Sequence, residues 1–220
     1  MPPGSAAPPG TALLVPLLVV AAVVFGVIAR DVVQGGPLSR LDLQIARWLH
    51  AHSSATLTTA LFIVTQFHST FAIAGFATIA AGLAAWNRRW PRMATIALVV
   101  GGGLLLNVLL KHAFHRARPA FDDPILTMDS FSFPSGHVAG STVFYALGVC
   151  WVIAQTTQLR WRLLAVLGAA LMVALVAFSR MALGVHYLSD VVAAFAEGVV
   201  WVTLCLSVFA TFRRDPRGRP

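Results

Sequence analysis

The sequence predicts an all-α fold: a polytopic membrane protein with six transmembrane helices. Of its 220 residues, 58% are hydrophobic and only 11% are charged, and the mean hydropathy is +0.78. This composition is too apolar for a soluble domain of the same length. The apolar residues form long runs separated by short polar breaks, and each span needs about 20 residues. The chain is therefore filled by six spans, without room for a second domain.

The basic residues lie in the breaks between the apolar runs. The formal charge is +8, from sixteen basic and eight acidic residues. A nucleic-acid-binding protein can show this balance, but it gathers its basic residues on one continuous face. Short basic breaks are instead typical of topology signals beside membrane spans. We therefore expect the bilayer as a partner and no nucleic acid; the sequence does not indicate an oligomeric state.

The composition divides the chain into three parts. Residues 1–11 are rich in Pro, Gly and Ala and are expected to form a disordered tail. Residues 12–212 are expected to form a single six-helix membrane domain, and residues 213–220 a basic cytoplasmic tail. The expected spans are 12–29, 71–86, 93–110, 137–154, 163–178 and 191–212.

Two segments outside the spans have open interpretations. The pattern of residues 41–52 predicts an amphipathic helix, which either lies on the membrane surface or packs on the spans. Ser39-x-x-Asp42 resembles a capping box at the start of this helix. Residues 54–70 predict either a short interfacial or dipping helix before the second span, or the first part of one long tilted helix.

The positive-inside rule predicts the orientation of the six spans. Three polar segments contain basic residues to which the sequence assigns no other role: 87–92, 155–162 and 213–220. With six spans, all three lie on one side, which the rule makes cytoplasmic. The polar segments 111–136 and 179–190 then lie at the outer, periplasmic or extracellular, face of the cell membrane.

The polar stretch 179–190 lies between two long apolar runs and combines three reactive residue types. Arg180 carries a planar fork of donors that suits phosphate oxygens. His186 and Asp190 are four residues apart, so on a helix they share one face. The carboxylate can then orient the imidazole and leave its other nitrogen free as a nucleophile.

This stretch is the third of three motifs, which are Lys111-x6-Arg118-Pro119, Pro134-Ser135-Gly136-His137 and Ser179-Arg180-x5-His186-x3-Asp190. Together they resemble the signature of the type 2 phosphatidic acid phosphatases (PAP2), and all eleven positions match in order. The fold of that family is shared with vanadium-dependent haloperoxidases. The resemblance implies a PAP2/haloperoxidase-like helical core and covers the chain from about the third span to the sixth.

The resemblance implies a metal-independent reaction with a covalent intermediate. His186 attacks phosphorus and becomes a phosphohistidine, while Asp190 orients it. His137 protonates the leaving oxygen and later activates water. The phosphate-binding residues implied by the motifs are Lys111, Arg118, Ser135, Gly136, Ser179 and Arg180. No metal or other cofactor is implied, because three cations neutralise the phosphate.

Three polar residues near the motifs have open roles. Asn107 lies four residues before Lys111 and either orients it or bonds a neighbouring helix. Arg116 occupies a variable position of the first motif; a structural role is favoured, and contact with a second phosphate or a lipid headgroup is the alternative. Glu197 is an intramembrane acid with either a paired structural role or a functional one.

The function implied is that of an integral membrane lipid phosphatase that hydrolyses a lipid phosphate or diphosphate. Family members act on phosphatidic acid, phosphatidylglycerol phosphate or undecaprenyl diphosphate, and the short six-span layout favours the last two. The same site also allows transfer of the phosphoryl group to another lipid, or a vanadate-dependent haloperoxidase. An alternative of another class is a lipid transporter or scaffold with an inactive site.

Overall fold

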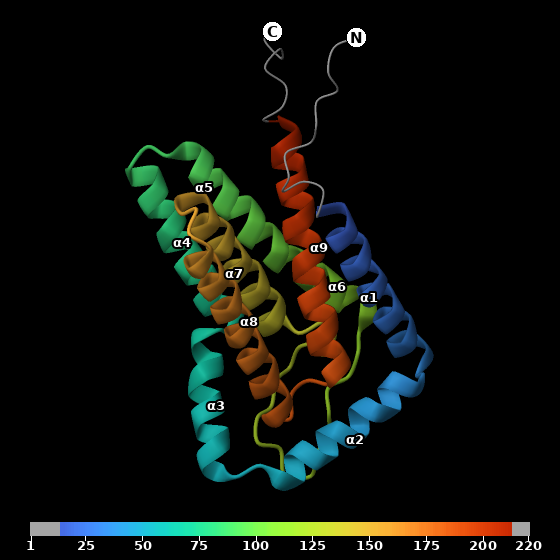
Figure 1. Ribbon diagram of the computed structural model, residues 1–220. Helices are drawn as coiled ribbons and strands as arrows, with labels where there is room; N and C mark the ends of the chain where they lie inside the picture. Colours follow the sequence, from blue (N-terminus) through green and yellow to red (C-terminus); the bar gives the residue numbers. More distant parts are fainter. Residues whose placement is uncertain (1–13, 213–220) are drawn as a thin grey trace.

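The computed structural model describes residues 14–212, and these form a bundle of helices (Figure 1). The part of the chain between these limits contains no strand, which confirms the all-α prediction. The helices are α1 (Leu14–Gln34), α2 (Pro37–His52), α3 (Ala55–Phe67), α4 (Thr70–Trp86), α5 (Trp90–Ile96), the π-helical turn η1 (Ala97–Gly101), α6 (Gly102–Phe114), α7 (Gly136–Gln155), α8 (Leu159–Ala182) and α9 (Leu188–Phe212).

Six helical segments are long and apolar enough to cross a membrane, as predicted. Two of them join several elements: Ala55–Trp86 comprises α3 and α4, and Trp90–Phe114 comprises α5, η1 and α6. The helices extend beyond most of the predicted apolar runs, because a helix continues past the hydrocarbon region into polar residues at the interface. The predicted tails 1–11 and 213–220 lie outside the described residues.

The segment 54–70 contains a separate short helix, α3, although α3 and α4 together are long and apolar enough to form one span. The break lies at His68 and Ser69, where the Ser69 hydroxyl accepts a hydrogen bond from the amide of Ala72 at 3.1 Å. A serine at this position starts a helix because it satisfies an amide that lacks a helical partner. The buried His68 ring bonds the Tyr145 hydroxyl on α7 at 2.8 Å.

Helix α2 begins earlier than predicted, and the capping box is wrong. Pro37 occupies its first turn after the N-cap Gly36, where the missing N–H of proline costs nothing. Ser39 therefore lies inside the helix, and its amide donates to the Asp31 carboxylate on α1 at 3.1 Å. Helix α2 crosses the ends of the other helices (Figure 1) and packs on α8 and α9.

Small residues let α6, α7 and α9 approach closely. A Cβ atom on Gly198 of α9 would lie 2.7 Å from the Thr142 side chain of α7, and one on Gly102 would lie 2.4 Å from Trp201 of α9. The Val99 carbonyl in the π-helical turn accepts a hydrogen bond from the Trp201 indole at 2.8 Å, in addition to the one from the Gly102 amide.

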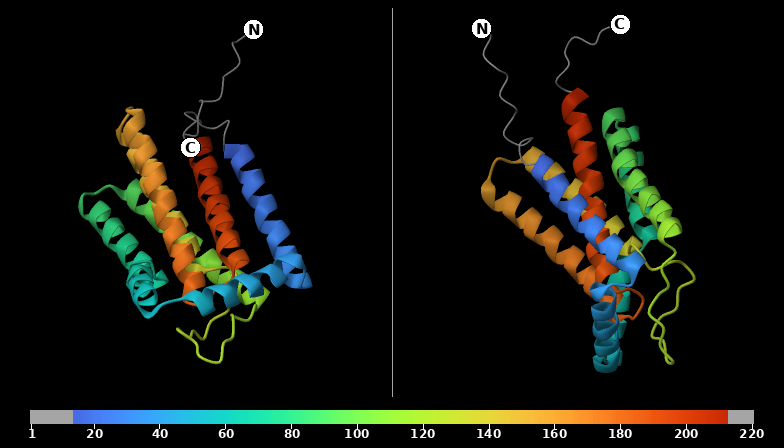
Figure 2. Two further views of the ribbon diagram at one scale, coloured as in Figure 1. Left: turned by 60° about the horizontal axis from the view of Figure 1, so that its bottom comes forward. Right: turned by 90° about the vertical axis from the view of Figure 1, so that its right-hand side faces the viewer.

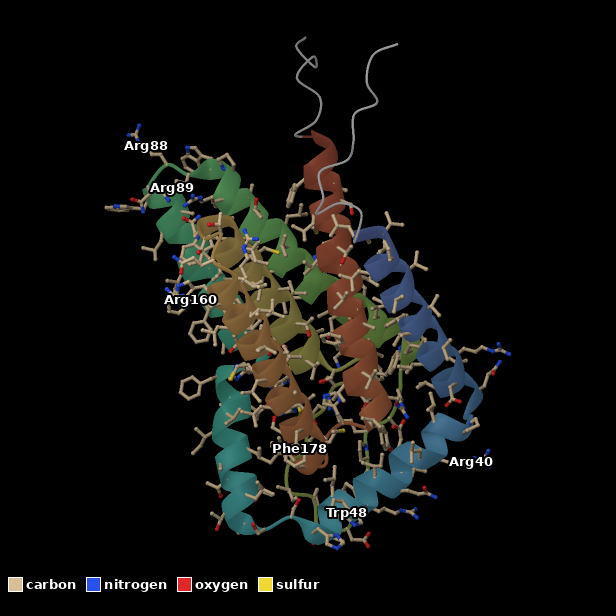
Figure 3. All side chains as sticks on the ribbon, in the orientation of Figure 1. Arg40, Trp48, Arg88, Arg89, Arg160 and Phe178 are labelled. Carbon is tan, nitrogen blue, oxygen red and sulfur yellow. The ribbon has the colours of Figure 1, made fainter. Side chains whose placement is uncertain are left out.

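The two ends of the bundle differ in character. Arg88, Arg89 and Arg160 lie at the end away from α2, whereas Arg40, Trp48 and Phe178 lie on or near α2 (Figure 3). The long connection between α6 and α7 lies at the α2 end, as two further views show (Figure 2). The connection between α8 and α9 lies at that end as well (Figure 1). The three motifs are therefore at one end of the bundle.

Candidate active site

His186 lies in the turn between α8 and α9, and its side chain is 1% exposed. The prediction that His186 and Asp190 share a helix face is wrong in detail, because α9 begins only at Leu188. The two side chains nevertheless meet, with Nδ1 of His186 3.3 Å from Oδ2 of Asp190. Asp190 is in the first turn of α9, and Oδ2 also accepts the Tyr187 amide at 2.9 Å. The carboxylate thus holds the preceding turn against the helix start.

The partners of His186 determine its tautomer. Nη1 of Arg118 lies 3.1 Å from Nε2 of His186. A guanidinium can only donate hydrogen bonds, so Nε2 is the acceptor and Nδ1 carries the proton that it donates to Asp190. Burial lowers the pKa of His186 to about 3, although Asp190 opposes this. The imidazole is therefore neutral around pH 7, with its Nε2 lone pair directed away from the carboxylate.

The carboxylate of Asp190 is fully buried and has several donors. Oδ1 accepts Nη1 of Arg116 at 2.6 Å, and Oδ2 accepts the Ser132 hydroxyl in a short hydrogen bond. The other nitrogen of the Arg116 fork, Nη2, lies 2.8 Å from Asp42 on α2. Burial disfavours the charge of Arg116, but Asp190 and Asp42 outweigh it and raise its pKa. Asp190 is thus held as an anion in a fixed position.

The second motif places the start of α7 beside Asp190. Ser135 is the N-cap residue, and its amide donates to the Asp190 carbonyl at 3.2 Å. Gly136 and His137 follow in the first turn, where free amides and the helix dipole attract anions. A Cβ atom on Gly136 would lie 3.1 Å from Oδ1 of Asn107 and 3.2 Å from Oγ1 of Thr70. A side chain larger than hydrogen would therefore require the Asn107 and Thr70 side chains to shift.

Three cations converge on His137. The charges of Arg180, Arg118 and Lys111 all act on its imidazole, as does His186. Burial lowers the pKa of Arg118, and such a desolvated cation attracts a phosphate more strongly than a hydrated one. The arrangement combines a helix start, two imidazoles and three positive charges.

Two polar atoms at the motifs lack partners within residues 14–212. These are Oγ of Ser135 and Nε of Arg180, both buried. The other nitrogens of Arg180 bond Oγ1 of Thr65 at 3.1 Å and the sulfur of Met128 at 2.8 Å. A buried donor without a partner is costly, and an anion bound at the motifs would supply one. The residue types present thus fit a phosphate.

Two predicted residues have partners elsewhere. The Ser179 hydroxyl donates to the Val176 carbonyl of its own helix at 2.7 Å, so it does not contribute a free donor. Asn107 donates to Oε2 of Glu197 on α9 at 3.0 Å. Of its two interpretations, the bond to a neighbouring helix therefore holds, and it gives Glu197 a paired role.

Sequence reasoning missed Asp42 and the role of Ser132. Asp42 is 2% exposed and lies four residues before the buried Ala46 on the same face of α2. An acid on the buried face of an amphipathic helix requires a buried partner, and this signal was present in the sequence. Arg116 bonds Asp190 directly. This contact agrees with the structural role that the sequence favours, but the sequence does not identify the partner.

Comparison with known proteins places this geometry in a family. The sequence matches the family described as the PAP2 superfamily over residues 92–214. Phosphatidylglycerophosphatase B of Bacillus subtilis (strain 168) is 32% identical over 133 residues, which make up 60% of this chain and 64% of that protein. Decaprenylphosphoryl-5-phosphoribose phosphatase of Mycolicibacterium smegmatis is 37% identical over 102 residues, 43% of this chain and 50% of that one. The chain thus spans between half and two thirds of these relatives.

A solved structure extends the similarity to the first helices. The crystal structure of a transmembrane PAP2 type phosphatidylglycerolphosphate phosphatase from Bacillus subtilis superposes with a TM-score of 0.73 at 25% identity. The superposition covers 94% of this chain and 98% of the other. Since the family match covers more than half of the 220 residues and includes all three motifs, the chain belongs to the PAP2 superfamily.

Proposed function

We propose that this protein is an integral membrane lipid phosphatase that works through a phosphohistidine on His186. The observation that carries the proposal is the imidazole of His186 itself. Its Nδ1 lies 3.3 Å from Asp190 and its Nε2 lies 3.1 Å from Arg118. A neutral, oriented imidazole is suited to attack a phosphoryl group. A phosphate that takes over the Arg118 hydrogen bond would free the Nε2 lone pair for that attack.

The proposed reaction has two steps. Nε2 of His186 forms a bond to phosphorus while the bond from phosphorus to the lipid oxygen breaks. His137 gives a proton to that oxygen from its imidazolium form, which the negative charge of the bound phosphate stabilises against the three nearby cations. Water then attacks the phosphohistidine, His137 takes a proton from it, and inorganic phosphate leaves. Asp190 stabilises the imidazolium that forms when His186 becomes positively charged. Lys111 and the two arginines neutralise the phosphoryl oxygens.

The substrate proposed first is phosphatidylglycerol phosphate, with polyprenyl phosphates or diphosphates such as undecaprenyl diphosphate second. The name of one relative, phosphatidylglycerophosphatase B, supports the first substrate. The name of the other, decaprenylphosphoryl-5-phosphoribose phosphatase, supports a polyprenyl-linked phosphate ester as a class, without naming a polyprenyl diphosphate. An apolar groove of about 520 Å³ between α2 and α8, at the end of the bundle that carries the motifs (Figure 1), offers a surface for a lipid tail. The groove is lined by Leu41, Gln44, Ile45, Trp48, Leu49, Phe178 and Met181.

The proposed location is the plasma membrane, with the site at its outer face. Support for the orientation comes from Arg88, Arg89 and Arg160, which lie at the end of the bundle away from the motifs, whereas Arg40 lies at the motif end (Figure 3). Cytoplasmic loops carry an excess of Lys and Arg. The motif end would then face the periplasm or the cell exterior.

The experiment that tests the function measures phosphate release by purified protein in detergent. The panel contains phosphatidylglycerol phosphate, phosphatidic acid and undecaprenyl diphosphate, each with EDTA present. We expect release by the wild type, inhibition by vanadate, and loss of release in His186→Ala. The matched control is His52→Ala, because His52 is an exposed histidine whose contacts are with Trp48. Full turnover in His186→Ala, or a requirement for magnesium, would contradict the proposal.

A further inference from the structure

Asp42 on α2 is a buried carboxylate with a complete set of donors. Its Oδ1 accepts the Ser189 amide at 2.9 Å, and its Oδ2 accepts the Ser189 hydroxyl at 2.5 Å and Nη2 of Arg116 at 2.8 Å. The carboxylate is 2% exposed. A buried charge of this kind is stable only when it is paired and hydrogen-bonded. Asp42 therefore fixes α2, the loop before α7 and the start of α9 relative to one another.

Arg116 connects this carboxylate to the one beside His186. Its Nη1 bonds Oδ1 of Asp190 and the Ser189 hydroxyl, each at 2.6 Å. Its guanidinium also lies 4.3 Å from the ring centre of Tyr187, the neighbour of His186. A guanidinium is a rigid planar fork. With Asp42 on one nitrogen and Asp190 on the other, the fork holds the second carboxylate at a fixed angle.

As a result, the two carboxylate oxygens of Asp190 have different partners. Oδ1 is occupied by Arg116, whereas Oδ2 faces Nδ1 of His186. Without Asp42, Arg116 would have one carboxylate partner instead of two. Its guanidinium could rotate about the Asp190 contact, and its charge would be balanced by Asp190 alone. Asp190 would then be less well oriented and less able to stabilise an imidazolium on His186.

We propose that Asp42 is a positioning residue for the reaction at His186, and that it acts through Arg116 on Asp190. The proposal rests on the proposed phosphatase function. Asp42 lies outside the three motifs and comes from a helix at the end of the bundle, so it touches neither the phosphate nor the reacting nitrogen. Its effect is expected in the rate of the chemical step and not in the affinity for the lipid.

The test compares Asp42→Asn with the matched charge removal Asp31→Asn. Asp31 also anchors α2, through the Ser39 amide at 3.1 Å, but it is bonded to no residue of the Asp190 cluster. For phosphate release from phosphatidylglycerol phosphate, Asp42→Asn is expected to lower kcat about 10- to 100-fold, as misplaced catalytic groups do. Its KM is expected to stay within about twofold, and Asp31→Asn to keep the wild-type kcat.

A second variant keeps the test decisive if Asp42→Asn does not fold. Arg116→Lys retains the charge but replaces the fork by a single point of contact, so it cannot bridge Asp42 and Asp190 in the same way. It is expected to lower kcat about as much as Asp42→Asn does. The double variant should be no worse than either single one, because both changes break the same link.

Several results would overturn the proposal. A wild-type kcat in Asp42→Asn or Arg116→Lys would do so, and so would equal losses in Asp31→Asn and Asp42→Asn, which would mean that Asp42 only secures α2. If the wild type releases no phosphate, the proposed phosphatase function is contradicted, and kcat can no longer test the role of Asp42. Orthovanadate then serves as the probe: a rise in melting temperature that Asp31→Asn keeps and Asp42→Asn loses supports the role of Asp42. A wild type unaffected by vanadate overturns both proposals.

Discussion

The imidazole of His186 lies between an anion and a cation, and each fixes one of its nitrogens. Asp190 accepts from Nδ1 at 3.3 Å, and Arg118 donates to Nε2 at 3.1 Å. The sequence predicted the first pairing from a spacing of four residues. It could not predict the second, because Arg118 and His186 are 68 residues apart. Contacts of that kind depend on how the helices pack, which no local spacing encodes.

The lowered pKa of His186 has a consequence for stability. Burial sets it at about 3 in the folded protein, whereas an unfolded histidine has a pKa of about 6.5. Between these values the unfolded chain binds the extra proton. The contribution of His186 is therefore complete above pH 6.5 and is lost as the pH falls towards 3. Its slope is at most about 1.4 kcal/mol per pH unit.

The expected result is a steeper acid loss of stability in the wild type than in His186→Ala. Melting temperatures measured in detergent from pH 7 to pH 4 provide the check, with His52→Ala as the control that should follow the wild type. Parallel curves for the wild type and His186→Ala would show that His186 titrates normally in the folded protein.

At the scale of elements, the site depends on where helices begin. The start of α7 brings Ser135 and Gly136 beside Asp190, and the start of α9 brings Asp190 beside the turn that carries His186. The apolar runs predicted the six spans well, since hydropathy marks the part of each helix that meets lipid. They did not predict the first turn of α2, where Pro37 and not Ser39 starts the helix.

Close packing between α7 and α9 is expected to depend on Gly198. A Cβ atom there would lie 2.7 Å from Cγ2 and 2.8 Å from Cβ of Thr142, so Gly198→Ala must push the two helices apart. We expect a loss of about 1–3 kcal/mol, as for other overpacked positions. Gly148→Ala on α7 is the control, because its Cβ would meet nothing within 4 Å and alanine favours a helix. Equal melting temperatures for the two variants would contradict this packing.

At the scale of the whole molecule, the three motifs lie at one end of the bundle, opposite the loop that carries Arg88 and Arg89 (Figure 3). The motif end carries α2, the connection between α6 and α7, and the turn with His186 (Figure 1). Arg88, Arg89 and Arg160 lie at the other end (Figure 3). The order of the six spans predicted this separation, because each crossing moves the chain to the other side of the membrane. The contact of α2 with the site was not predicted, since Asp42 reaches Arg116 and Ser189 across the fold.

In cells, we expect the two ends of the bundle to be accessible from opposite sides of the membrane. In a chain with Cys150 and Cys205 replaced by alanine, single cysteines are introduced at two exposed positions, Asp122→Cys and Arg89→Cys. A maleimide that cannot cross membranes should label Asp122→Cys in intact spheroplasts and Arg89→Cys only after lysis. The reverse pattern would place the site on the cytoplasmic face.

The most direct test of the account is detection of the phosphoryl group on His186. Purified wild type is mixed with phosphatidylglycerol phosphate labelled at its terminal phosphate, quenched in alkaline detergent within a turnover, and digested for mass spectrometry. The account predicts a phosphoryl group on the peptide that contains His186, absent from His186→Ala and retained in His52→Ala. Phosphate release by the wild type without this adduct, or with the label on another residue, would contradict it.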